Sequence, residues 1–202
     1  MKITALKQQI KNPQRVSVFV DEKYSFSLSL DELVKYRLKN SDDLSGADVK
    51  KFKRISEDGK LKARALAWVL NRPHSVREFR DYMRRKKADE SLTQDLIEEF
   101  NSRKYLDDEH YAKWLYEMRA RASKSDRAIR AELASKGVDR EMASQLLEEQ
   151  GGDEAERLRE LIAKKKKLSR YQNDQTKLIQ YLTSQGFSYS LVKQALKINK
   201  PE

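Results

Sequence analysis

The stretch that decides the fold is Ser75-Val-Arg-Glu-Phe-Arg-Asp-Tyr-Met-Arg-Arg-Lys-Lys87, because two later stretches repeat its pattern. They are Ser125-Asp-Arg-Ala-Ile-Arg-Ala-Glu-Leu-Ala-Ser-Lys-Gly137 and Asp174-Gln-Thr-Lys-Leu-Ile-Gln-Tyr-Leu-Thr-Ser-Gln-Gly186. In each stretch, apolar residues recur one helical turn apart. Each opens on a residue that caps helices, and two of the three close on Gly, which accepts the left-handed conformation after a helix. The pattern predicts the same helix three times.

A further helix is predicted on either side of each stretch. Downstream, the apolar positions Leu92, Leu96 and Ile97 recur as Met142, Leu146 and Leu147, and again as Leu191, Ala195 and Leu196. Upstream, apolar helices are expected over residues 61–70, 111–118 and 158–168. Each unit is therefore three helices, with a period of about 50 residues. Because one small unit buries little apolar area alone, we expect the units to stack into a curved, elongated rod.

The first part of the chain has a different pattern. Residues 15–20 and 24–28 alternate apolar and small polar side chains around a short connection, which predicts a β-hairpin, and residues 3–10 are a candidate third strand. Ser29-Leu-Asp-Glu32 is a capping box, which predicts a helix start. A later helix containing Val49 is expected to end at Asp58-Gly59.

These patterns predict a mainly α protein with a small N-terminal α+β region over residues 1–60. Three-helix repeats are then expected over 61–106, 107–150 and 151–202. The linker Glu149-Gln-Gly-Gly-Asp153 is expected to be a hinge, because paired glycines leave the backbone free.

Composition narrows the functional classes. The chain of 202 residues has a formal charge of +11 and no cysteine, so it offers no disulfide framework or thiol nucleophile. No apolar run approaches the roughly 20 residues of a membrane span, and the start lacks a signal-peptide core. We therefore expect a cytoplasmic protein that is attracted to polyanions such as nucleic acid. We also expect a monomer.

Catalytic motifs are missing from the sequence. There is no Gly-rich phosphate loop and no Gly-x-Ser-x-Gly elbow. His74 and His110 are interpreted as residues of solvated helix starts rather than metal ligands, and the aromatics Tyr105, Tyr111, Trp114 and Tyr116 as core. We expect neither an enzyme nor a cofactor or metal site.

Basic residues are the candidate binding groups. Arg77 and Arg80 occupy the same repeat positions as Arg127 and Arg130, three residues apart and so on one helix face. A pair in register across stacked units predicts a basic strip, although a merely solvated face remains the alternative. The run Lys164-Lys-Lys-Lys167 has the same two interpretations. The candidate partner-binding or DNA-binding residues are Arg77, Arg80, Arg84, Arg119, Arg121, Lys124, Arg127, Arg130 and Lys136.

The repeats resemble the RecX family, which regulates the bacterial recombinase RecA. The resemblance rests on Ala65-Leu-Ala-Trp-Val-Leu70 followed by Arg72-Pro-His-Ser-Val-Arg-Glu78, on Lys104-Tyr-Leu-Asp-Asp-Glu-His-Tyr-Ala112, and on Lys124-Ser-Asp-Arg-Ala-Ile-Arg-Ala-Glu-Leu-Ala-Ser-Lys-Gly-Val138. It runs from about residue 60 to the end, and the N-terminal region is similar to the extension of longer members. Two features depart from the family pattern. Lys87 stands where Gly is usual, and Thr176 and Ile179 replace the arginine pair in the third repeat.

The resemblance implies a rod that lies in the groove of the RecA filament on DNA. There it would inhibit filament growth, ATP hydrolysis, strand exchange and co-protease activity, and so act in homologous recombination, DNA repair and the SOS response. Direct contact with single-stranded or double-stranded DNA is a further implied interaction. Two other functions fit the residues: a DNA-binding protein that acts without RecA, and a helical adaptor for another protein.

Overall fold

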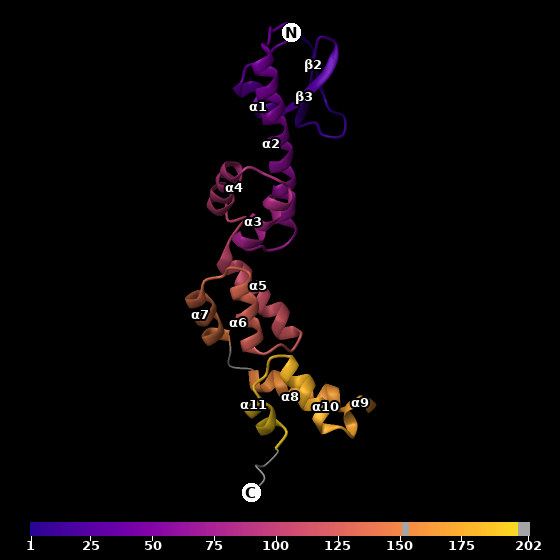
Figure 1. The fold of residues 1–202 in the computed structure, drawn as a ribbon, viewed down its shortest axis with the longest axis vertical. Helices are drawn as coiled ribbons and strands as arrows, with labels where there is room; N and C mark the ends of the chain where they lie inside the picture. Colours follow the sequence, from indigo (N-terminus) through magenta and orange to yellow (C-terminus); the bar gives the residue numbers. More distant parts are fainter. Residues whose placement is uncertain (151–153, 198–202) are drawn as a thin grey trace. The chain divides into compact units, whose positions relative to one another are not determined.

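The computed structural model describes residues 1–150 and 154–197 and divides the chain into two compact units, Met1–Asn71 and Arg72–Glu202 (Figure 1). The expected hinge at Gly151-Gly152 lies outside the described residues. Among the helices described, none combines the length and the apolar character needed to cross a bilayer.

The first unit contains a small antiparallel sheet of three strands in the order β1-β2-β3. The strands are β1 (Ile3–Gln8), β2 (Arg15–Val20) and β3 (Lys23–Ser29). Asp21 and Glu22, between β2 and β3, have φ values of 47° and 66°. Two successive left-handed residues are what a tight type I′ hairpin turn requires. The predicted hairpin and its third strand are both confirmed.

Two helices follow the sheet, α1 (Leu30–Lys35) and α2 (Gly46–Asn71). Ser29 accepts a hydrogen bond from the backbone of Glu32, whose carboxylate accepts one in return from the backbone of Ser29, so the predicted capping box is confirmed. Val18, Phe26 and Phe52 are buried together, where α2 packs on the sheet. The unit therefore has its own apolar core.

The predicted end of a helix at Asp58-Gly59 is wrong, because α2 continues unbroken to Asn71. An isolated Gly costs a helix only about 1 kcal/mol relative to Ala. Here it also makes room, since a Cβ atom on Gly59 would lie 2.7 Å from Oε1 of Glu32 and 3.4 Å from the guanidinium of Arg15. The glycine allows the close approach of neighbouring side chains and does not stop the helix.

The second unit is entirely helical in its described residues. Its elements are α3 (Val76–Arg85), α4 (Glu90–Ser102), α5 (Asp108–Arg121), α6 (Asp126–Ser135), α7 (Arg140–Gln150), α8 (Glu154–Lys166), α9 (Ser169–Gln172), α10 (Gln175–Ser184) and α11 (Tyr189–Ala195). Helices α5, α6 and α7 share one core around Tyr111 and Leu133, and helices α8 to α11 share another around Leu158 and Leu182.

The mainly α fold, the N-terminal sheet and the three-helix repeats are thus confirmed. The four-residue helix α9 was not predicted. The finer division of the chain at residues 60, 106 and 150 and the curvature of the expected rod stay predictions.

Candidate partner-binding surface

Helices α3 and α6 carry the two predicted arginine pairs, and each begins at a buried serine. The hydroxyl oxygens of Ser75 and Ser125 accept hydrogen bonds from the backbones of Glu78 and Ala128, and both serines are 0% exposed. The third repeat begins the equivalent helix, α10, with Asp174, which accepts from the backbone of Lys177. All three predicted caps are confirmed. They fix where the first turn of each helix begins.

Arg77 and Arg127 lie in this first turn, and their side chains are exposed. The amino end of a helix carries a partial positive charge, so a cation there is unfavourable for the helix. Helix stability therefore does not explain two arginines at this position. Arg80 and Arg130 lie one turn later and are also exposed.

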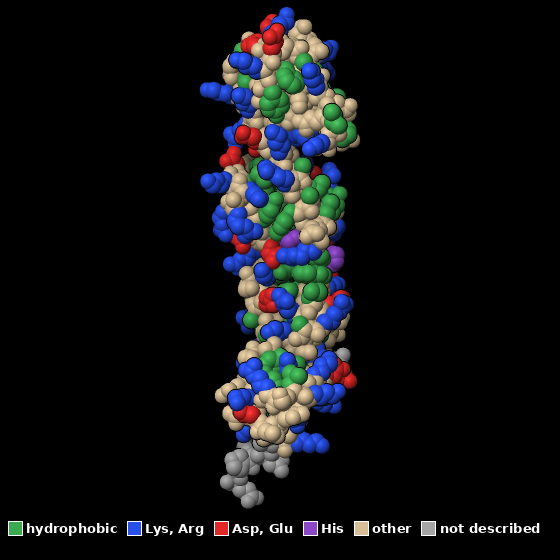
Figure 2. All heavy atoms as spheres, turned by 90° about the vertical axis from the view of Figure 1, so that its right-hand side faces the viewer, with side chains coloured by type: hydrophobic (Ala, Val, Ile, Leu, Met, Phe, Trp, Pro, Cys, Tyr) green, Lys and Arg blue, Asp and Glu red, His purple; other side chains and the backbone are tan. Residues whose placement is uncertain are grey.

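Lysine and arginine side chains are numerous over the face drawn in Figure 2, with aspartate and glutamate among them. Positive charge alone therefore does not locate a binding surface. Ion pairing is more informative, because a cation already held by a carboxylate must lose that contact before it can meet a phosphate or an acidic partner.

Two of the predicted residues are held by partly buried carboxylates. Arg119 donates two hydrogen bonds to Glu132, from Nε at 2.7 Å and from a terminal nitrogen at 2.6 Å. The Nζ atom of Lys136 lies 2.9 Å from Glu78, whose side chain is only 13% exposed. Both cations contribute to the packing of this unit.

A second group of predicted residues forms exposed ion pairs. Arg80 lies 2.9 Å from Glu90, Arg121 lies 3.2 Å from Glu117, and Arg84 pairs with Asp81. Solvent-exposed pairs contribute about 0 to 1 kcal/mol, so these arginines can exchange partners at little cost.

The remaining predicted residues have no side-chain hydrogen bond or ion pair with any residue of 1–150 or 154–197. They are Arg77, Lys124, Arg127 and Arg130. We call this set the unpaired cations. Both Arg127 and Arg130, the equivalent pair of the second repeat, belong to it.

The spacing between α3 and α6 is set by contacts between repeats. The hydroxyl of Ser75 donates to the carbonyl oxygen of Lys136 at 2.7 Å, and the backbone N–H of Val76 donates to Asp108 at 2.9 Å. The next junction uses the corresponding positions, with a backbone donor in place of the serine hydroxyl. The backbone N–H of Ser125 donates to the carbonyl of Gln185 at 3.3 Å, and that of Asp126 to Glu154 at 3.0 Å.

Glycines allow this approach at both junctions. Gly137 and Gly186 have φ values of 81° and 99°. A Cβ atom on Gly137 would lie 2.8 Å from Cβ of Arg77, and one on Gly186 would lie 2.3 Å from Oγ of Ser125. The equivalent Lys87 also has a left-handed φ, 57°, although it carries a side chain.

Comparison with known proteins supports this architecture. Residues 1–45 match the regulatory protein RecX N-terminal domain, residues 107–147 the second three-helix domain of RecX, and residues 152–196 the third. The chain is 30% identical over 200 residues to regulatory protein RecX of Listeria innocua, covering 96% of this chain and 74% of the relative. This chain belongs to the RecX family.

A second relative and two solved structures are also RecX proteins. Regulatory protein RecX of Bacillus subtilis is 30% identical over 200 residues, which cover 96% of this chain and 75% of the relative. A crystal structure of regulatory protein RecX superimposes with a TM-score of 0.71 at 22% identity, covering 97% of this chain and 98% of that one. RecX from Lactobacillus salivarius gives 0.57 at 24% identity, over 69% and 94% of the two chains. At these identities the two structures show the shared fold.

An ionic cluster at the first junction of this RecX family protein was missed by the sequence analysis. Glu78 lies 3.0 Å from Arg72, 2.9 Å from Lys136 and 3.1 Å from Nδ1 of His74. Burial by itself would raise the pKa of Glu78, but hydrogen bonds from these three residues outweigh it and lower the pKa to about 2. The carboxylate is therefore charged at neutral pH.

The interpretation of His74 as a solvated residue is wrong, because it is 3% exposed and belongs to this cluster. His110 is exposed. Of the aromatics predicted as core, Tyr111 and Tyr116 are buried, while Tyr105 and Trp114 are partly buried. In the part of the chain that the structure describes, no group of three or more His, Asp or Glu side chains is arranged to hold a metal ion.

Proposed function

We propose that this RecX family protein binds the RecA filament assembled on DNA and restrains its growth, ATP hydrolysis, strand exchange and co-protease activity. The observation that carries the proposal is the equivalent placement of Arg77 and Arg127 at the starts of α3 and α6, both without a carboxylate partner. Such cations are available to phosphate groups or to an acidic protein surface. The protein would act as a cytoplasmic monomer and without catalysis of its own.

The repeat junctions explain why a filament suits such a surface. Because the hydroxyl of Ser75 and the backbone N–H of Val76 both donate to residues of the second repeat, the arginines of α3 and α6 are presented at a fixed separation. A partner that also repeats can engage both positions at once, and the second contact then forms intramolecularly, which raises the overall affinity.

The candidate residues would differ in how directly they contact the partner. The unpaired cations would meet the partner directly, and Arg80, Arg84 and Arg121 would join by giving up exposed ion pairs. Arg119 and Lys136 would act through the packing of the unit. Reversing the charge of Arg119 or Lys136 would therefore change the stability of the protein as well as its binding.

The decisive experiment reverses Arg127→Glu and Arg130→Glu together and measures inhibition of the DNA-dependent ATP hydrolysis of a bacterial RecA. We expect at least about a tenfold higher concentration for half inhibition, because two contacts become repulsive. The matched control is Arg140→Glu with Arg159→Glu, which removes the same charge from exposed positions outside the predicted set. Full inhibition by the folded Arg127/Arg130 variant, or an equal loss in the control, would show that these residues are not the contact.

A function on DNA without RecA remains the alternative, and the same unpaired cations support it. The two functions differ in what the protein binds when RecA is absent. A helical adaptor for some other protein would show neither RecA inhibition nor DNA binding.

A further inference from the structure

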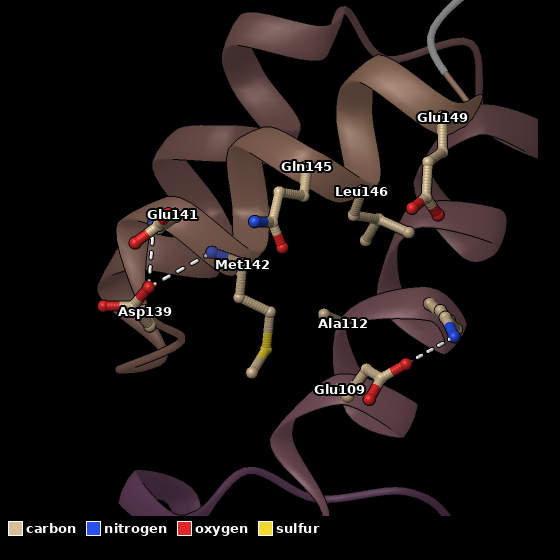
Figure 3. A pocket seen from close by; sticks show the side chains of 9 residues that line it. Glu109, Ala112, Asp139, Glu141, Met142, Gln145, Leu146 and Glu149 are labelled. Carbon is tan, nitrogen blue, oxygen red and sulfur yellow. Dashed lines mark hydrogen bonds and ion pairs between the residues drawn. The ribbon is translucent and has the colours of Figure 1, made fainter.

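A pocket of about 430 Å³ lies between α5 and α7 of the second repeat, and it is formed by helices other than those that carry the arginine pairs (Figure 3). Its lining residues are Glu109, Ala112, Lys113, Asp139, Glu141, Met142, Gln145, Leu146 and Glu149. The side chains of Met142 and Leu146 point into the space between the two helices, opposite Ala112 (Figure 3). The pocket thus combines an apolar wall with a rim of carboxylates.

The carboxylates at the rim of the pocket differ in their hydrogen-bond and ion-pair partners. Asp139 accepts hydrogen bonds from the backbones of Glu141 and Met142 and so caps α7. Glu109 lies 2.6 Å from Nζ of Lys113. Glu141 and Glu149 have no side-chain hydrogen bond or ion pair with the described residues. Two carboxylates beside one apolar pocket therefore lack a hydrogen-bonded or ion-paired partner among the described residues, although Lys113 of the same pocket attracts Glu149 electrostatically.

The third repeat has a pocket at the equivalent place, between α8 and α11, with a volume of about 260 Å³. Its charged lining residues are Arg159 and Lys197, and the apolar ones include Ala155, Leu191 and Ala195. The same position between first and third helices is thus acidic in one repeat and basic in the next. The acidic rim is a property of the second repeat and not a requirement of the three-helix fold.

We propose that the pocket between α5 and α7 is a second binding site, which receives a basic amphipathic segment of a protein partner. Arg or Lys side chains of that segment would lay their methylene groups on Met142 and Leu146, and separate ones would direct their charges to Glu141 and to Glu149, which lie about 12 Å apart along α7. Nucleic acid is a poor occupant, because its phosphates would meet the same carboxylates. The site goes beyond the proposed function and does not depend on RecA being the partner.

The test uses the full chain and a fluorescein-labelled, acetylated peptide of alternating Leu and Arg, with binding measured by fluorescence anisotropy at physiological salt. The Leu-Glu peptide is the negative control. We expect Glu149→Lys to weaken binding about fivefold or more, as the loss of a partly exposed ion pair and its replacement by repulsion predict. The matched control Glu148→Lys makes the same charge change one residue away, outside the pocket lining, and should weaken binding less than about twofold.

A second readout locates the peptide. In a chain labelled with 13C at its methionine methyl groups, the resonance of Met142 should move on peptide binding, while that of the buried Met83 should not. An unchanged Met142, or equal losses for Glu148→Lys and Glu149→Lys, would show only general attraction of a cationic peptide and would overturn the proposal. Self-association of the chain that Glu149→Lys abolishes, measured by sedimentation, would make a second copy the occupant and would also overturn it.

Discussion

The side chain of Ser75 donates a hydrogen bond of 2.7 Å to the carbonyl oxygen of Lys136, which lies 61 residues further along the chain. The same hydroxyl oxygen accepts the backbone N–H of Glu78 and so caps α3. One buried side chain therefore starts a helix in one repeat and satisfies the end of a helix in the next. The stability of the cap and the docking of the repeats are coupled through this atom.

Ser75→Ala should lower the free energy of unfolding by about 2 kcal/mol, because it removes a helix cap and leaves the partly buried carbonyl of Lys136 without its donor. Urea unfolding followed by circular dichroism measures this change. Ser188→Ala is the control, since Ser188 caps α11 at an exposed position and should cost about 0.5 kcal/mol. Equal losses in the two variants would mean that the contact with Lys136 contributes nothing.

Gly137→Ala should destabilise the protein by at least about 2 kcal/mol. The φ of 81° disfavours any side chain by about 1 to 2 kcal/mol, and the new Cβ would lie 2.8 Å from Cβ of Arg77. At Gly46, by contrast, the nearest atom to a new Cβ is 3.8 Å away, so Gly46→Ala should be neutral or slightly stabilising. Thermal unfolding of both variants tests the comparison, and a neutral Gly137→Ala would contradict it.

Lys87→Gly, at the position equivalent to Gly137, should stabilise the protein. Lys87 is exposed and already left-handed, with a φ of 57°, so glycine removes the steric cost of that conformation at the expense of some chain entropy. The net effect should be a gain of about 0.5 kcal/mol, measurable by urea unfolding. A loss of stability would show that the Lys87 side chain makes a favourable contribution of its own.

Acid should weaken the junction through Glu78. Its pKa is about 2 in the folded protein and 4.5 ordinarily, so the unfolded chain takes up the proton first as the pH falls. The stabilisation is therefore complete above about pH 5 and is lost towards pH 2, with an upper bound of about 3 kcal/mol. The pH dependence of unfolding should be flatter in Glu78→Gln, while Glu117→Gln, at an exposed pair, should retain the parent slope.

Salt dependence separates direct DNA binding from binding that requires RecA. If the unpaired cations contact phosphates, the logarithm of the affinity for DNA alone should fall linearly with the logarithm of salt concentration. Replacing Arg127 and Arg130 with Gln should lower that slope by up to about 2, since each phosphate contact contributes about 0.9. An absence of DNA binding at low salt would exclude the function without RecA.

Elements that are determined by neighbouring residues could be predicted from the sequence. Ser75, Ser125 and Asp174 cap their helices because a side-chain oxygen reaches backbone donors within the same turn. The hairpin at Asp21 and Glu22 follows from alternation and a short turn in the same way. These elements require no information about distant residues.

Features that depend on tertiary contacts were not predictable. Gly59 has the appearance of a helix end, but packing of α2 against the sheet and the space needed by Glu32 and Arg15 override the local preference. The cluster around Glu78 is completed by Lys136, which lies in the next repeat and far from Glu78 in the sequence. The pairing of Arg119 with Glu132 and of Lys136 with Glu78 likewise depends on tertiary contacts, whereas the pairs of Arg84 and Arg121 are local to one helix.

Asp174 occupies the place that the buried Ser75 and Ser125 hold in the other repeats, and its carboxylate is partly exposed and pairs with Lys177 at 2.8 Å. A further repeat that docked on α10 as the second repeat docks on α3 would have to strip water from both charges, which costs several kcal/mol. A charged Asp174 would therefore disfavour the docking of a further repeat on α10. The same cost would oppose association in which the repeats of one molecule dock on this helix of another.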